Sequence, residues 1–101
     1  HAHVCSALGD PKRLQILYAL NEEPRRVSAL AKDLDTPQPT ISRHLAILRQ
    51  RSLVHSDREG VAVTYSLADP RIIQVLDTMR MVLRDALDRQ SGWLNNGSNR
   101  E

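Results

Sequence analysis

The sequence contains no phenylalanine, and aromatic residues make up only 3% of it. Its core must therefore be built from Leu, Ile, Val and Ala side chains, mostly along helices. Cysteine occurs once, so no disulfide forms within the chain, and this usage suits a reducing cytosol. No apolar run reaches the roughly 18 residues that a membrane-spanning helix needs, and no signal-peptide pattern is present. These absences predict a soluble, cytoplasmic protein with no membrane partner.

Length and net charge set narrow bounds. The 101 residues fit one small domain with a marginal core, and a second copy of the chain would add buried surface. The net charge of +2 is too small to indicate a polyanionic partner by itself. An argument for nucleic acid must therefore rest on where the charges lie.

A first helix is predicted from Asp10-Pro11 to Asn21. Aspartate is a preferred N-cap, proline is tolerated in the first turn, and leucines recur at helical spacing behind them. A shorter helix follows, capped by Ser28 and closed by Asp35.

The stretch TPQPTISRHL predicts the next helix, from Thr36 to about Arg51. Thr36 can cap it, and Pro37 and Pro39 fit its first turn, because amides there have no partner within the helix and proline has none to lose. The short break before this helix predicts a helix-turn-helix. Its core face is predicted to hold Ile41, Leu45 and Leu48.

The period then changes from helix to strand. Apolar residues alternate from Val61 to Leu67, and Leu53–His55 is the expected partner strand. The segment Asp57–Gly60 is expected to form the turn between them, since glycine supplies a permissive backbone. A β-hairpin therefore follows the helix-turn-helix.

A long terminal helix is predicted from Asp69-Pro70 to about Gln90. One side of its apolar stripe can pack on the domain, and the other needs a partner. The residues expected in a homodimer interface are Ile72, Val75, Leu76, Met79, Val82, Leu83 and Leu87. Residues 1–90 would form one DNA-binding and dimerisation domain, and residues 91–101 a flexible polar tail.

Positive charge concentrates on the helix-turn-helix and hairpin. Between Thr36 and Arg58 there are four arginines, including Arg49, against Asp57 alone, whereas the terminal helix is balanced. A phosphate backbone would lie along the positive segment. The alternative is an ordinary solvated helix face.

Three stretches together resemble the ArsR/SmtB family of winged-helix repressors: LGDPKRLQILYAL, VSALAKDLDTPQPTISRHLAILRQRSLV and SDREGVAVTYSL. The resemblance implies a mostly α-helical winged helix-turn-helix with a small β-hairpin. It also implies a homodimer formed through the terminal helices. Its partner would be double-stranded operator DNA carrying an inverted repeat, and repression would be relieved by a metal ion, a thiol or redox signal, or a small-molecule inducer.

By position, the resemblance makes Gln38–Arg51 the recognition helix. Its groove-facing residues would be Gln38, Thr40, Ser42 and Arg43, whose side chains suit adenine, guanine and phosphate contacts. Arg58 would meet a minor-groove edge or a phosphate from the hairpin tip, or else be a free loop residue. His44 is interpreted as a packing and hydrogen-bonding residue rather than a DNA contact.

The ligand sets of metal- and thiol-sensing relatives are missing. Neither cysteine of the thiol type occurs in Ser28–Leu34, and only Asp69 remains of the zinc type. A metal ion at a cluster of His1, His3 and Cys5 remains open, as does a redox role for Cys5. The alternatives are a disordered or truncated N-terminal arm and a small apolar inducer between helices.

Two other classes of function are compatible with a chain of this size. A winged-helix module could bind DNA without sequence preference, or bind protein, and have no inducer; the polar set on the recognition helix argues against it. The sequence shows no Ser-His-Asp arrangement, phosphate loop or paired catalytic carboxylates, so an enzyme is not expected.

Overall fold

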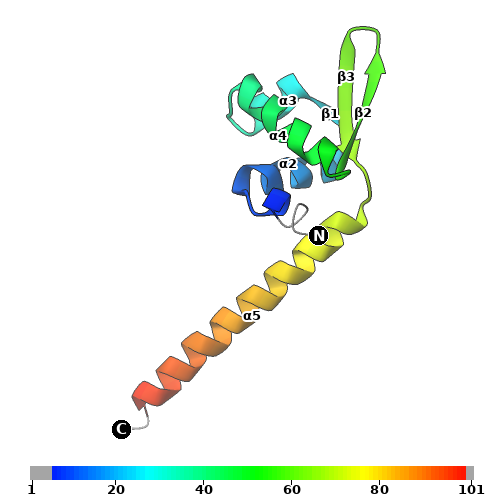
Figure 1. The fold of residues 1–101 in the computed structure, drawn as a ribbon. Helices are drawn as coiled ribbons and strands as arrows, with labels where there is room; N and C mark the ends of the chain where they lie inside the picture. Colours follow the sequence, from blue (N-terminus) through cyan, green and yellow to red (C-terminus); the bar gives the residue numbers. More distant parts are fainter. Residues whose placement is uncertain (1–5, 100–101) are drawn as a thin grey trace. The chain divides into compact units, whose positions relative to one another are not determined.

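The computed structural model describes residues 6–99, with side chains through residue 92. The chain divides into two compact units after Pro70 (Figure 1). The first unit holds helices α2, α3 and α4 and a three-stranded antiparallel sheet, and the second is the long helix α5. The mostly helical winged helix-turn-helix with a small sheet is confirmed.

Helix α2 (Pro11–Glu22) starts as the sequence predicts. Asp10 is its N-cap, and the carboxylate accepts hydrogen bonds from the amides of Lys12 (2.8 Å) and Arg13 (3.4 Å). The Arg13 side chain then reaches back and donates from Nε to the carbonyl of Ala7 at 2.7 Å. The start of α2 is therefore fixed by two side chains, those of Asp10 and Arg13.

Helix α3 (Val27–Asp33) begins one residue before the expected Ser28 cap, with Arg26 as its N-cap. It ends with Asp35 in the left-handed region, at φ 48°. There the amide of Thr36 donates to the carbonyl of Ala31 at 2.9 Å, the longer-range bond of a Schellman motif.

Helix α4 (Gln38–Gln50) does not begin with a Thr36 cap, so that expectation is wrong. The hydroxyl of Thr36 donates instead to the carbonyl of Leu34 at 2.9 Å, an acceptor left over at the end of α3. Pro37 takes the N-cap position, and Pro39 lies in the first turn as predicted.

The C-terminal end of α4 has the same hydrogen-bond pattern as the end of α3. The amide of Leu53 donates to the carbonyl of Leu48 at 2.9 Å, and the amide of Ser52 donates to that of Arg49 at 3.0 Å. Ser52 is left-handed, with φ 61°. This Schellman motif turns the chain from α4 directly into the hairpin.

The first unit is held by an apolar core without buried polar side chains among the described residues. The predicted inner face of α4 is confirmed, since Ile41, Leu45 and Leu48 are fully buried. The other core residues of this unit are Ala7, Ile16, Leu17, Leu20, Leu30, Leu53 and Val54. Helix α4 packs against both α2 and α3.

The sheet has the order β1-β3-β2, with β2 (Val54–Glu59) and β3 (Ala62–Leu67) forming the predicted hairpin. Its turn is shorter than expected, because the pairing continues up to Glu59 and Ala62. Only Gly60 and Val61 form the loop, with Gly60 at φ 62°. A positive φ at the first central position alone fits a type II′ turn.

Strand β1 (Arg25–Arg26) was not predicted; it pairs with Tyr65 and Thr64 of β3. Arg25 donates to the carboxylates of Glu22 (2.7 Å) and Asp33. These contacts join the end of α2 and the end of α3 to the sheet.

The second unit is helix α5 (Arg71–Asn99), which begins after the predicted Asp69-Pro70 signal. The helix was expected to end near Gln90, and that end is wrong, because the helix continues to Asn99. A glycine costs a helix only about 1 kcal/mol and need not end it. The flexibility of residues 91–101 stays a prediction. Residues 100–101 lie outside the described part. Within residues 6–99, no helix combines the length and apolar character needed to cross a membrane.

Candidate nucleic-acid interface

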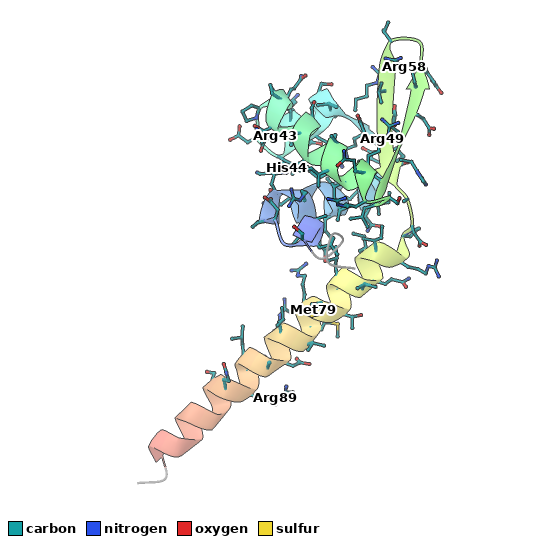
Figure 2. The ribbon with its side chains drawn as sticks, in the orientation of Figure 1. Arg43, His44, Arg49, Arg58, Met79 and Arg89 are labelled. Carbon is teal, nitrogen blue, oxygen red and sulfur yellow. The ribbon has the colours of Figure 1, made fainter. Side chains whose placement is uncertain are left out.

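Most of the polar residues predicted to contact DNA lie on the exposed side of α4. Gln38, Ser42, Arg43 and Arg49 are exposed, and Thr40 is half-buried. Figure 2 shows Arg43 and Arg49 on this helix. On the core side of α4 the side chains are fully buried. Their packing fixes the orientation of the exposed polar side.

The N-terminus of α4 has few amides to offer a ligand. Pro37 and Pro39 have none, and the amides of Thr40 and Ile41 both donate to the Pro37 carbonyl at 3.1 Å. Contacts by this end of the helix therefore depend on side chains, starting with Gln38.

The hairpin carries Arg58 close to its tip (Figure 2). Arg58 is exposed and pairs across the ladder with Val63, one pair before the loop. Val61, in the loop itself, is fully exposed, and sequence reasoning did not single it out. The hairpin thus projects one cation and one apolar side chain at its end.

An open polar groove runs between the C-terminal end of α4 and β2. We call it the α4–β2 groove; it is lined by Arg49, Ser52, Val54, His55, Ser56 and Asp57. Arg49 also lines a neighbouring hollow with Ala46 and Gln50, so the groove continues the exposed face of α4. Of its lining residues, only Arg49 was predicted as a site residue. The groove arises from a helix end meeting a strand edge, and no local motif marks it.

His44 lies half-buried on α4, and its Nδ1 atom is buried without a hydrogen-bond partner. Burial lowers the pKa of His44, and the positive charges of Arg13 and Arg43 add to this effect. The Asp10 carboxylate opposes the lowering but does not overcome it. Burial therefore favours the neutral form of the His44 imidazole, and the hydrogen bond expected for it is not found at Nδ1.

Asp10, the N-cap of α2, interacts electrostatically with His44. Burial alone would raise the pKa of its carboxyl, but the backbone hydrogen bonds from Lys12 and Arg13 outweigh this and lower the pKa. The nearby His44 contributes in the same direction.

No metal centre is found in the part of the chain that the structure describes: no three His, Cys, Asp or Glu side chains there are placed to hold an ion. The predicted cluster of His1, His3 and Cys5 lies outside that part.

The predicted interface residues follow one stripe of α5. Val75, Met79, Val82, Leu83 and Leu87 are each more than half exposed, and Ile72 and Leu76 are half-buried. A shallow apolar hollow lies on this stripe, lined by Gln74, Val75, Thr78, Met79 and Val82. Met81 is equally exposed but lies off the stripe, among charged residues. Such a patch on an isolated chain marks an interaction surface.

Comparison with known proteins agrees with this architecture. Residues 10–56, from the cap of α2 to the start of the hairpin, match the family described as "Bacterial regulatory protein, arsR family". The HTH-type transcriptional repressor SmtB of Mycobacterium tuberculosis is 39% identical over 82 residues, which is 80% of this chain. The chain spans 61% of SmtB's own length.

Solved structures extend the likeness to most of the chain. The crystal structure of Rv0081 from M. tuberculosis has a TM-score of 0.80 and 33% identity, covering 89% of this chain and 91% of Rv0081. The homodimeric winged helix-turn-helix DNA-binding domain of Mb0332 from Mycobacterium bovis has a TM-score of 0.76 and 31% identity, covering 87% of this chain and 82% of that one. The matched family is one of regulatory proteins and SmtB is a transcriptional repressor, so the relatives point to a regulator rather than an enzyme. This chain belongs to the ArsR family of helix-turn-helix, DNA-binding transcriptional regulators.

Proposed function

We propose that this protein is a dimeric, sequence-specific repressor that binds an inverted repeat in operator DNA. The observation that carries the proposal is the two-sided character of α4. One face is fully buried, and the other presents exposed Gln38, Ser42 and Arg43. Buried residues fix the helix axis, so the polar side chains keep one register against a groove. The name of the relative SmtB, a repressor, supports the direction of regulation.

In this proposal α4 is the recognition helix. Gln38 pairs with adenine and Arg43 with guanine, since each side chain offers two hydrogen bonds to one base edge. The hydroxyls of Thr40 and Ser42 contact bases or phosphates. Arg49 holds a phosphate, and Arg58 enters the minor groove or meets the backbone from the hairpin.

The dimer forms through the apolar stripe of α5. The stripe exposes five large apolar residues that have no cover within one chain's described structure, and the related Mb0332 domain is a homodimer. A twofold axis would place the two recognition helices about 34 Å apart, one turn of DNA. The protein would work in the cytoplasm, where bacterial DNA lies.

Release from the operator would need an inducer, and its class is the least supported part of the proposal. A metal or thiol signal would act through His1, His3 and Cys5. A small molecule between the helices would act without them. Operator affinity measured with and without zinc, cadmium, arsenite and oxidant, for the native chain and for Cys5→Ala, separates these classes.

The test of the main proposal is DNA selection followed by footprinting. An inverted repeat protected in both halves is the expected result, and equal affinity for shuffled duplexes would overturn it. Arg43→Ala adds a second test. We expect a loss of about 1–3 kcal/mol in discrimination at one base position. A uniform loss on all sequences would instead favour a winged-helix module without base readout.

A further inference from the structure

The α4–β2 groove combines features of an anion site that the recognition face does not explain. Its lining includes one arginine, Arg49, together with His55, Ser52 and Ser56. Guanidinium and hydroxyl groups are phosphate donors, and phosphate contacts come mostly from such side chains. The groove also continues the exposed face of α4 through Arg49.

Ser52, in the lining of this groove, has an unusual backbone conformation. It occupies the left-handed position of the Schellman motif at φ 61°, where glycine is the usual residue. Asp35 takes the same position after α3, but aspartate visits this region readily because its short polar side chain bonds locally. A serine at such a position costs stability, and strain of this kind concentrates at functional sites. Ser52, unlike a glycine, has a side chain at this strained position, and Ser52 lines the groove.

Asp57 is exposed on β2 and lines the same groove, so a carboxylate-bearing residue lies beside Arg49 and the two serines. A carboxylate beside a phosphate repels it. The groove therefore contains both the donors for an anion and a group that weakens its binding.

We propose that the α4–β2 groove seats one backbone phosphate of the operator, held by Arg49 with the hydroxyls of Ser52 and Ser56, and that Asp57 limits the affinity of this seat. The inference rests on the proposed function, since the phosphate belongs to the bound DNA. It adds three residues, Ser52, Ser56 and Asp57, to the interface and gives them roles in affinity rather than in sequence choice.

The first experiment uses Ser52→Gly on the full chain. Glycine relieves the left-handed strain, so the variant should be more stable than the native protein, which also shows that it folds. It should nevertheless bind operator DNA about three- to tenfold more weakly, the worth of one hydrogen bond. Ser28→Ala removes an exposed hydroxyl on α3 outside the groove and is the matched control, with affinity unchanged. A Ser52→Gly variant that binds as tightly as the native chain overturns the role of its hydroxyl.

The second experiment compares Asp57→Asn with Glu59→Gln. Both remove one negative charge from β2, but only Asp57 lines the groove. Asp57→Asn should tighten binding about two- to fivefold at moderate salt, as expected for one surface charge. An equal gain from Glu59→Gln would mean that net charge, not the groove, is responsible.

The third experiment locates the phosphate. Operator duplexes carry a neutral methylphosphonate at one position at a time. At one position in each half-site, the native chain should lose affinity, and Ser52→Gly should then cost nothing more. Equal costs of Ser52→Gly at every position overturn the seat while leaving sequence-specific binding intact. If the native chain shows no preferred duplex, the proposed function itself has failed.

Discussion

The carboxylate of Asp10 accepts a hydrogen bond from the amide of Lys12, with 2.8 Å between oxygen and nitrogen. This bond satisfies an amide that has no partner within α2 and fixes the residue at which the helix begins. The same carboxylate lies in the neighbourhood of His44 on α4, and each influences the pKa of the other. The cap of α2 is thus electrostatically coupled to the helix that carries the candidate DNA-binding face.

Replacing Asp10 with alanine should destabilise the protein by about 1 kcal/mol, the usual worth of an N-cap side chain. Urea unfolding followed by circular dichroism measures the change. Asp10→Asn keeps an acceptor oxygen and should retain most of the stability. If both variants lose the same amount, the hydrogen bond is not the source of the effect.

Stability should fall when the pH drops below 6.5, and His44 is the reason. Its pKa in the folded chain is lowered from 6.5, so the unfolded chain takes up a proton first as the pH falls. The contribution is fully present above pH 6.5 and is lost as the pH falls from there toward the folded pKa. The free energy of unfolding, measured on both sides of pH 6.5, should depend less on pH in His44→Gln.

The Asp10 carboxyl acts in a separate window. Its pKa is lowered from 3.8, so its contribution is present above that value and is lost only as the pH falls through the folded pKa. A decline between neutral pH and about pH 5 that survives in His44→Gln would show that another group titrates.

Arg25 should stabilise the junction of α2, β1 and α3. Its side chain is only 14% exposed and is surrounded by the carboxylates of Glu22, Glu23 and Asp33. Arg25→Ala should cost about 1–2 kcal/mol, because the partners are partly solvated. A double-mutant cycle with Asp33→Asn measures the pair, and additive losses would exclude a direct coupling.

The elements that the sequence predicted well are those set by local chemistry. The start of α2 follows from an aspartate cap and a proline in the first turn, and both act within a few residues. The inner face of α4 follows from helical spacing alone. Strand β1 escaped prediction, because two residues become a strand only by pairing with β3, far along the chain.

Other details depended on competition that the sequence does not display. Thr36 could cap α4 or close α3, and it closes α3 because the carbonyl of Leu34 is within reach. The candidate DNA residues were predicted from a helix face and a resemblance. Ser52, Ser56 and Asp57 were not, because the α4–β2 groove exists only where α4 and β2 meet in space.

The proposed dimer interface can be tested at two methionines of α5. Met79 and Met81 are similarly exposed on α5, at 55% and 63%, but only Met79 lies on the apolar stripe. Met79→Glu should convert the dimer to monomer, since a twofold interface would bury the new charge from both chains without a partner. Met81→Glu adds the same charge on the other side of the helix and should leave the dimer intact.

Analytical ultracentrifugation of both variants measures the oligomeric state. A dimer that survives Met79→Glu, or that is lost equally in Met81→Glu, would place the interface elsewhere. Loss of operator binding in Met79→Glu alone would further show that two linked recognition helices are required.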